Sequence, residues 1–412
     1  MNAEHPLSSR NLAVRCCIVG GGPAGMMLGY LMGRAGIDTV VLEKHADFLR
    51  DFRGDTIHPS TLELMHELGL LGALLALPHQ KVDRLAVQFG GAALSIADFT
   101  HLPTRCKFIA MMPQWDFLHF LSVAAAKYPG FRLIMRAEAT GLIRDDGRVV
   151  GVHATTPDGP LELRAPLTVA ADGRHSTLRA KAGLPSQAFG APMDVLWFRL
   201  SRRADDPAAT GGIVEPGRLF VLINRAEHWQ CAFVIPKGAF DAVRARGLDA
   251  FRADIARLAP FAAERVREIA SWDDVKLLTV QVDRLLRWHA PGLLCSGDAA
   301  HAMSPVGGVG INLAIQDAVA AANLLHAPLR AGQITEDDLA RVQRRRDFPT
   351  RATQRFQLII QNNVIRSVLQ GGAVFRPPLL LRLFSRIPLL QRIPARVLGL
   401  GFRPEHIRSP AA

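Results

Sequence analysis

Residues 15–25 read Arg15-Cys-Cys-Ile-Val-Gly-Gly-Gly-Pro-Ala-Gly25, an apolar run that leads directly into a glycine-rich turn. The apolar run predicts a short buried strand, and residues 23–34 predict the helix that follows the turn. Gly20 permits the tight turn, Gly22 lets the backbone approach a pyrophosphate, and Gly25 lets the helix pack closely on its strand. The helix N-terminus then faces an anion. This stretch therefore predicts a Rossmann-type unit that binds an adenine dinucleotide.

Three predicted strands end at an acidic residue. Residues 38–43 end in Glu43, about twenty residues past the glycines, where a ribose hydroxyl needs an acceptor. Two later strands end in Asp172-Gly173 and in Gly297-Asp298. Asp298 suits a polyol better than a phosphate, because a carboxylate accepts hydrogen bonds from hydroxyl groups and repels anions. This preference favours FAD over NAD as the tightly held ligand.

The pattern of apolar residues divides the chain into an α/β domain with an antiparallel β domain inserted in it. Residues 194–281 contain strands that alternate polar and apolar side chains, and residues 85–96 predict a hairpin of the same sheet. One helix is predicted at 240–258. The predicted domains are a discontinuous FAD-binding domain at 12–81, 108–185 and 284–330, a substrate-binding β domain at 82–107 and 186–283, and a C-terminal helical, arginine-rich segment at 331–412.

Composition excludes several classes of protein. The 412 residues contain five cysteines without a C-x-x-C pair, which argues against a disulfide framework and against a metal site. No apolar run approaches the roughly eighteen residues of a membrane helix, and residues 1–13 lack the apolar centre of a signal peptide. We therefore expect a cytoplasmic protein.

The net charge of +12 lies in one part of the chain. Residues 341–408 contain fourteen arginines, no lysine and two acidic residues, Asp347 and Glu405, so this tail alone accounts for the net charge. Between 379 and 397 arginines lie four residues apart beside apolar faces, as in helices that lie on anionic lipid. Two interpretations stay open: a peripheral contact with the inner face of a membrane, or leucines that pack on the core while arginines face water. Nucleic-acid binding is not expected, because no recognised module accompanies the charge.

The three motifs occur in one chain, in the order Gly20 to Gly25, Asp172-Gly173, Gly297-Asp298, around an inserted β domain. In this the chain resembles the flavin-dependent (group A) monooxygenases of the aromatic-hydroxylase type, which have the para-hydroxybenzoate hydroxylase fold. The resemblance covers roughly residues 14–326. It implies FAD as cofactor, NADPH or NADH as a transient electron donor, and O2, with hydroxylation of a hydrophobic, ring-bearing small molecule through a flavin C4a-hydroperoxide.

The resemblance also implies roles for individual residues. Catalytic roles fall on Arg53, Asp55 and Pro305. An alternative for Asp172 is that it only closes a turn after its strand. Cofactor contacts are implied at Gly20, Gly22, Pro23, Ala24, Gly25, Glu43, Lys44, Arg53, Gln114, Asp172, Gly297, Asp298, Pro305, Gly308, Val309, Gly310, Ile311 and Asn312.

For the substrate, the inserted sheet offers Trp197, Arg199, Phe220, Trp229 and Phe233, although each also fits an ordinary sheet position. A helix that begins near Gly310 would point its N–H groups at the negative charge of a reduced flavin. A reductase or dehydrogenase of the same fold, acting on a lipid or prenyl substrate, is the alternative function. A flavin halogenase is disfavoured, because its Trp-x-Trp-x-Ile-Pro signature is absent from the sequence.

Overall fold

A six-stranded sheet, in which five strands run parallel, forms the centre of the first domain. The computed structural model describes residues 10–49, 56–207, 210–371 and 379–412. The strand order β21-β22-β13-β2-β3-β9 brings distant parts of the sequence side by side. Most of these strands are apolar runs buried on both faces, as a parallel sheet between two layers requires. The strands are β2 (Cys16–Val19), β3 (Thr39–Glu43), β9 (Phe131–Met135), β13 (Leu167–Ala170), β21 (His289–Ala290) and β22 (Leu293–Cys295).

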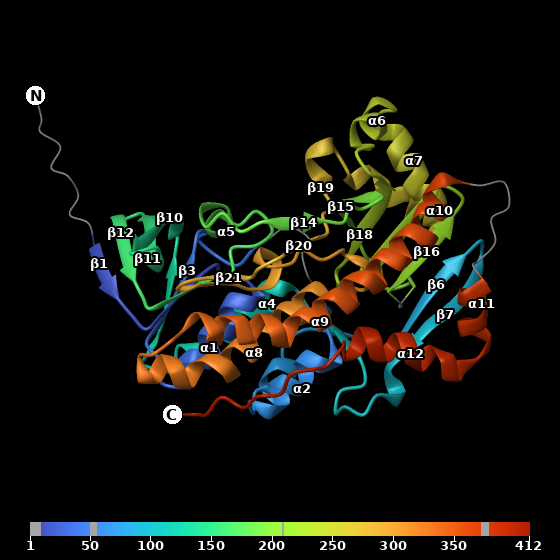
Figure 1. Ribbon diagram of the computed structural model, residues 1–412. Helices are drawn as coiled ribbons and strands as arrows, with labels where there is room; N and C mark the ends of the chain where they lie inside the picture. The colour runs from blue at the N-terminus through green and yellow to red at the C-terminus, as the bar shows by residue number, and fades with distance from the viewer. Residues whose placement is uncertain (1–9, 50–55, 208–209, 372–378) are drawn as a thin grey trace, which may run out of the picture.

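Helices cover one face of this sheet, and a second sheet covers the other (Figure 1). The predicted helix α1 (Pro23–Arg34) lies close to the strands, because a β carbon on Gly29 would lie only 2.6 Å from the side chain of Val41. On the same face lie α2 (Pro59–Glu67), α3 (Leu71–Leu75), α4 (Gln114–Ala125) and α8 (Gly310–Ala331). The covering sheet has the order β1-β12-β11-β10, with β1 (Arg10–Ala13), β10 (Glu138–Asp145), β11 (Arg148–Thr156) and β12 (Gly159–Arg164).

One helix has the length and mean hydropathy of a membrane span. It comprises Val306–Ala331, and 78% of its apolar window is buried inside the protein. The sequence has no uninterrupted apolar run there, because polar residues such as Asn312, Gln316 and Asp317 lie among the apolar ones. These polar side chains are themselves buried in the protein, so this is a core helix of the first domain.

The predicted second sheet has seven strands, in the order β19-β15-β18-β17-β16-β6-β7. All neighbours are antiparallel except β16 and β6. The predicted helix over 240–258 is wrong in one respect: Gly247, with a φ of 89°, separates α6 (Phe240–Ala245) from α7 (Leu248–Leu258). The strands are β6 (Arg84–Phe89), β7 (Ala92–Asp98), β15 (Met193–Ser201), β16 (Gly211–Glu215), β17 (Arg218–Asn224), β18 (His228–Pro236) and β19 (Lys276–Leu278).

Two small sheets lie at the junction of the two domains. One consists of β4 (Thr56–Ile57), β8 (Ile109–Met111) and β5 (Gln80–Val82), and the other pairs β14 (Ser186–Ala188) with β20 (Asp283–Leu285). The second pairs the chain segment that enters the β domain with the one that leaves it.

A long C-terminal helix joins the two domains (Figure 1). α9 (Glu336–Ile360) packs on α8 and continues through a π-helical turn, Gln361–Ile365, into α10 (Arg366–Gln370) beside the seven-stranded sheet. α11 (Leu379–Arg386) and α12 (Pro388–Gly399) then pack against β7. The tail returns to the first domain, where the backbone N–H of Ala412 donates to Arg34 O at 2.8 Å.

Candidate active site

The glycine-rich turn forms a cradle whose backbone leaves no space for a side chain at Gly20 or Gly25. Gly20 has a φ of 110°, and a β carbon there would lie 2.2 Å from Ala171 O. A β carbon on Gly25 would lie 1.9 Å from Gly20 O, whereas one on Gly22 meets nothing within 4 Å. Gly22 caps α1 with extended backbone, and no side chain of the described part of the chain bonds to that helix end. The N–H groups of α1 therefore face open space, which suits a pyrophosphate.

Glu43 ends β3 directly beside this cradle. Its Oε2 accepts a hydrogen bond from Gly21 N at 2.9 Å, and its Oε1 accepts one from His45 N at 3.0 Å. The side chain is thus held in a buried position, and a carboxylate has further lone pairs for ribose hydroxyls. The neighbouring Lys44 is exposed at the surface.

Asp172 follows β13 and bonds to the first turn of the next helix, whose N-cap residue is Ser176. Its carboxylate accepts hydrogen bonds from Ser176 Oγ and from Leu178 N, at the start of α5 (Thr177–Lys181). Burial raises the pKa of Asp172, although these hydrogen bonds oppose the shift. The structure supports the alternative in which Asp172 closes a turn, and its contact with the cofactor stays a prediction.

Asp298 lies at the end of β22, the parallel neighbour of β13. Gly297 brings it against the cradle: a β carbon on Gly297 would lie 3.1 Å from Ala24 Cβ and 3.3 Å from Ala314 Cβ. Arg174 Nη2 donates to Asp298 Oδ2 at 3.2 Å, a contact that the sequence analysis missed. The cradle, Asp298 and the start of α8 therefore adjoin one another, as an elongated dinucleotide requires.

The loop before α8 contains two glycines that the structure requires. Gly307 has a φ of 77° and Gly308 a φ of 63°, and a β carbon on Gly308 would lie 2.5 Å from Thr56 Oγ1. Gly310 differs, because a β carbon there would make only an ordinary contact, 3.7 Å from Met303 Cβ. The steric requirement therefore falls on Gly307 and Gly308. α8 begins at Gly310 as predicted, and no described side chain caps it.

The predicted flavin-contact residues of this loop divide into buried and accessible groups. Asn312 is buried, accepts from His58 N and Thr61 Oγ1, and donates to Thr56 O at 3.1 Å, so its side chain holds the loop in place. Val309 and Ile311 point into apolar clusters. Pro305 opens the turn and is partly exposed, and Gln114 begins α4. Arg53 and Asp55 lie outside the described residues.

The five predicted substrate residues lie on opposite faces of the seven-stranded sheet. Phe220, Trp229 and Phe233 are buried in the cluster beneath α7, where Phe233 and Phe251 meet edge to face at 5.4 Å. These three side chains are part of that core, so the five predicted residues do not line one common substrate site. Trp197 and Arg199 lie on the other face: Trp197 packs against the cluster that contains Val309, and Arg199 is exposed.

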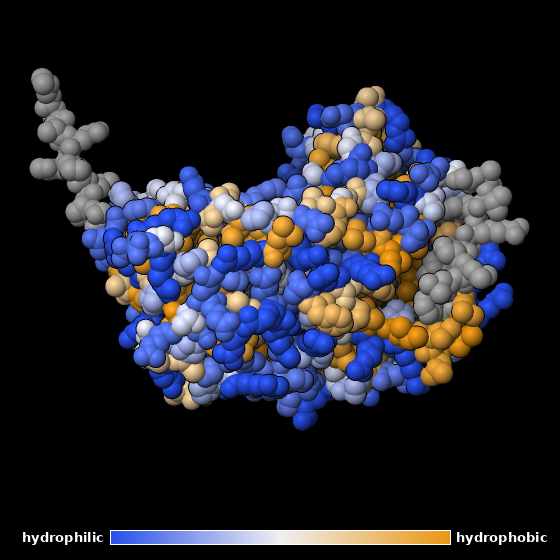
Figure 2. Space-filling model, in the orientation of Figure 1, coloured by the Kyte–Doolittle hydropathy of each residue, from blue (hydrophilic) through white to orange (hydrophobic). Residues whose placement is uncertain are grey.

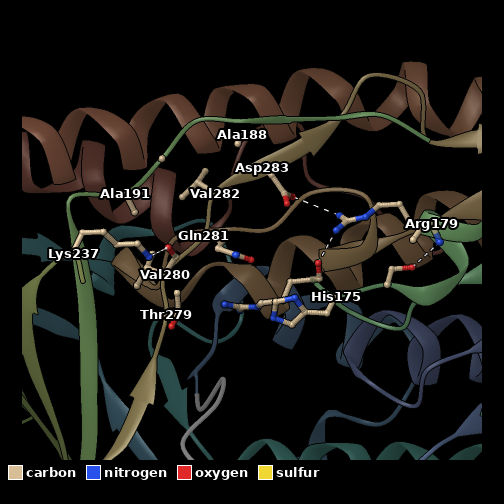
Figure 3. Close-up of a pocket in the computed structure, with 14 residues that line it drawn as sticks. His175, Arg179, Ala188, Ala191, Lys237, Thr279, Val280, Gln281, Val282 and Asp283 are labelled. Carbon is tan, nitrogen blue, oxygen red and sulfur yellow. Dashed lines mark hydrogen bonds and ion pairs between the residues drawn. The ribbon is translucent and has the colours of Figure 1, made fainter. Parts of the chain in front are cut away.

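Two cavities lie between the domains. The larger, about 640 Å³, lies beside the Asp172-Gly173 loop, with Arg179 3.7 Å from Asp283 on one side and Lys237 Nζ donating to Val280 O at 2.7 Å on the other (Figure 3). The smaller, about 270 Å³, is lined by Met111, Pro113, Trp115 and Asp116 from the first domain and by Arg199, Arg225, His228 and Gln230 from the sheet.

The smaller cavity adjoins the loop before α8. Met111 lines it and pairs with Thr56, whose Oγ1 donates to Gly308 O at 2.8 Å. Burial lowers the pKa of His228 below its ordinary value, and the charges of Arg199 and Arg225 lower it further, so His228 is neutral at pH 7. Burial raises the pKa of Asp116 on the opposite wall. The cavity therefore combines an aromatic wall with cationic groups from the sheet.

The comparisons with known proteins agree with this geometry. A family model described as an FAD binding domain matches residues 13–356. The 6-methylpretetramide 4-monooxygenase of Streptomyces rimosus is 32% identical, over 95% of this chain and 94% of that protein. The chain belongs to the FAD-binding monooxygenases. A rifampicin monooxygenase of Streptomyces venezuelae is 28% identical, over 73% of this chain and 61% of that protein, so the chain spans less than two thirds of this second relative.

Solved structures confirm the predicted fold of this FAD-binding monooxygenase. The anhydrotetracycline hydroxylase OxyS of Streptomyces rimosus has a TM-score of 0.73 at 23% identity, covering 96% of this chain and 77% of its own. The p-nitrophenol 4-monooxygenase PnpA of Pseudomonas putida has a TM-score of 0.75 at 20% identity, covering 96% and 100%. A Rhodococcus jostii relative named as a probable NADH-specific resorcinol 4-hydroxylase is 28% identical, over 77% of this chain and 59% of that protein.

The residues present fit FAD. The turn is closely packed at Gly20 and Gly25 but open at Gly22, which leaves room for a backbone-bound pyrophosphate, and Asp298 adjoins it with acceptor oxygens for a polyol. When bound, FAD supplies the redox chemistry between the nicotinamide donor and oxygen. Gly307, Gly308 and the N–H groups at the start of α8 are the groups of this chain that would hold its ring and stabilise negative charge on it. Family membership thus favours a monooxygenase over the reductase alternative.

Proposed function

We propose that this monooxygenase hydroxylates an electron-rich ring of a polycyclic aromatic compound, using NAD(P)H and O2. The carrying observation is the near full-length similarity to a 6-methylpretetramide 4-monooxygenase. The smaller cavity supports it, because Trp115 lines it together with the polar groups of Arg199 and Gln230. Such a site binds a flat aromatic body by stacking and an oxygen substituent by hydrogen bonds.

Trp197 and Arg199 are the residues that we assign to the substrate. They lie two positions apart in β15 and therefore point to the same face of the sheet. Trp197 lies against the cluster around Val309, beside the flavin loop, and Arg199 lines the smaller cavity. A substrate that touches both would place its ring near the turn at Gly307 and Gly308.

The larger cavity is the proposed docking place of the nicotinamide donor. Its cationic side chains already have acidic partners: Arg174 with Asp298, Arg179 with Asp283, and Lys237 with Asp194. An anionic donor must share these cations with carboxylates, which favours a brief encounter over tight binding. This suits a donor that leaves once it has transferred its electrons.

Oxygen uptake and product mass test the proposed function. We expect the purified protein to be yellow, and a polycyclic phenol to accelerate NAD(P)H oxidation and yield a product that carries one atom from labelled O2. Monocyclic phenols serve as the matched comparison. A dialkyldecalin synthase of Streptomyces rugosporus is 28% identical to this chain, so turnover without oxygen consumption is the result that would contradict the proposal.

We also propose that the protein is cytoplasmic and contacts the inner membrane face through α11 and α12. One side of α12 packs into the protein through Ala395 and Leu398, whereas Leu389 and Ile393 are 63% and 57% exposed. Figure 2 shows an apolar patch over this region. Residues 348–404 contain no acidic residue, and Arg386, Arg392 and Arg396 are exposed around the patch. Apolar side chains ringed by arginines suit anionic lipid.

Flotation with vesicles of anionic phospholipid tests this contact. We expect binding at low salt that decreases at high salt and is lost when Leu389 and Ile393 are both changed to glutamate. Leu286→Glu is the control, because Leu286 is also 63% exposed but lies outside α11 and α12. Absence of flotation at low salt, or equal loss in the control, would overturn the contact.

A further inference from the structure

One face of the C-terminal helix carries a row of buried glutamines. Gln354 and Gln357 lie in α9 and Gln361 begins the π-helical turn, and all three are at most 1% exposed. Their spacing of three and four residues places them on one side of the helix. Uncharged amides in such a position need hydrogen-bond partners, because a buried polar group without one is costly.

Each glutamine donates to backbone that lies outside the two large sheets. Gln354 Nε2 donates to Asp283 O at 2.7 Å and to Ala302 O at 3.2 Å. Gln361 Nε2 donates to Gly190 O at 3.5 Å. Asp283 and Gly190 belong to the segments that join the two domains, whereas Ala302 lies in the loop before α8.

Gln357 makes the most contacts with that loop. Its Nε2 donates to Ser304 O and to Val306 O, both at 2.8 Å, and its Oε1 accepts from Ser304 N at 3.2 Å. The three bonds lie on either side of Pro305, which has no N–H to donate. A buried loop without a sheet or helix ladder must obtain its hydrogen bonds elsewhere, and here one side chain supplies three of them.

We propose that Gln357 is a positioning residue that sets where Pro305 and the start of α8 lie against the flavin ring. The effect of Gln357 on catalysis rests on the proposed function, whereas the hydrogen bonds by which it holds the loop do not. The amide suits the task because it donates twice and accepts once at the same place. A glutamate would keep the acceptor and place negative charge against two carbonyl oxygens.

The effect reaches the flavin through backbone. Val306 is followed by Gly307 and Gly308, whose positive φ angles fix the turn, and then by the uncapped N-terminus of α8. A shift of Ser304 to Val306 therefore moves the N–H groups that stabilise negative charge on the reduced ring. The reduction potential of bound FAD is expected to follow the position of this loop.

The variant Gln357→Met, which keeps the side-chain length but removes the three bonds, tests the inference. Gln343→Met is the matched control: Gln343 lies on the same helix, donates to Leu286 O at 3.0 Å and accepts from Trp288 N at 3.0 Å, far from the loop. In FAD-free protein, we expect the Ser304 amide to exchange with solvent at least about tenfold faster in Gln357→Met only. In FAD-loaded protein, we expect an altered flavin absorption spectrum and a lower reduction potential, again in Gln357→Met only.

A second variant keeps the test decisive if Gln357→Met folds poorly. Gln357→Glu should shift the spectrum at neutral pH, and lowering the pH should reverse the shift, because a protonated glutamic acid regains one donor. If Gln357 has only a structural role, Gln357→Met and Gln343→Met should lower stability to the same extent. The Ser304 exchange rate and the flavin spectrum would then be unchanged, and this result would overturn the proposal. Exchange and spectrum do not depend on turnover, so a failure of the proposed hydroxylation is distinguishable from a failure of this inference.

Discussion

Arg174 and Asp298 form an ion pair of 3.2 Å that joins the loops after two adjacent parallel strands. The pair holds the Asp298 carboxylate in place between the glycine cradle and α8, where we expect the cofactor to bind. Asp298→Ala is expected to weaken FAD binding on the order of tenfold or more, because hydrogen bonds to charged groups contribute about 1.5–3 kcal/mol. Titration of flavin fluorescence measures the change. Asp38→Ala, which removes the partner of Arg132 at the opposite end of β3 from Glu43, is the control and should leave the FAD dissociation constant unchanged.

Substitutions at Gly308 and Gly310 should differ in effect. Gly308→Ala places a β carbon 2.5 Å from Thr56 Oγ1 at a positive φ, whereas Gly310→Ala makes only a normal contact. We expect Gly308→Ala to lower the free energy of unfolding by at least about 1–2 kcal/mol, and Gly310→Ala to change it by less. Urea unfolding of the two variants measures this difference, and equal effects would contradict the steric argument.

Because His58 is buried, we expect the folded protein to lose stability in mild acid. It is fully buried, its ring nitrogen Nδ1 bonds to Leu398 O at 2.7 Å, and burial lowers its pKa from 6.5 to about 4. Below pH 6.5 the unfolded chain binds a proton that the folded chain refuses, so stability decreases as the pH falls from 6.5 toward 4, by on the order of 3 kcal/mol in all. His58→Asn keeps a donor for Leu398 without this titration. Its unfolding free energy should vary less between pH 7 and pH 5, and an unchanged slope would count against the assignment.

The two faces of the substrate sheet should respond differently to truncation. Phe220→Ala removes a side chain from the core beneath α7 and should cost about 3–5 kcal/mol of stability. Trp197→Ala should cost less stability but reduce the acceleration of NAD(P)H oxidation by substrate, because Trp197 lies beside Val309. Thermal unfolding and substrate-stimulated turnover, measured on both variants, separate the two roles. A stable Phe220→Ala with impaired turnover would reverse the assignment.

Local rules predicted the parts of the site that depend on short stretches of sequence. The cradle at Gly20 to Gly25, the strand before Asp298 and the start of α8 near Gly310 each follow from neighbouring residues, because turn and helix signals act over a few positions. The same rules predicted β15, β17 and β18 of the second sheet, but not β16 or β19. They failed at Gly247, where one glycine separates two helices that share apolar periodicity.

Contacts between distant residues were not predictable in this way. All but the last residue of β18 is buried at least in part, so alternation could not show whether Trp229 and Phe233 face the flavin or α7. Arg174 directly follows the Asp172-Gly173 motif in the sequence, but its partner lies 124 positions away. Gln357 binds a loop 53 residues earlier, and an isolated glutamine in a helical pattern carries no signal of such a partner. These contacts depend on tertiary packing, which brings the helix and the loop together.

The insertion of one domain into another has a consequence for synthesis on the ribosome. β22 (Leu293–Cys295) pairs with β13 and completes the row of parallel strands, and α8 packs against one face of these strands. The dinucleotide-binding domain is therefore incomplete until both β22 and α8 have emerged from the ribosome. The hairpins β6–β7 and β17–β18 join residues close in sequence and can pair much earlier. We therefore expect the nascent chain to expose the apolar edge of β13 for most of its elongation, and to take up flavin only in the last stage of translation. Because the domain is completed so late, we expect the nascent chain to depend on chaperones until the last part of elongation.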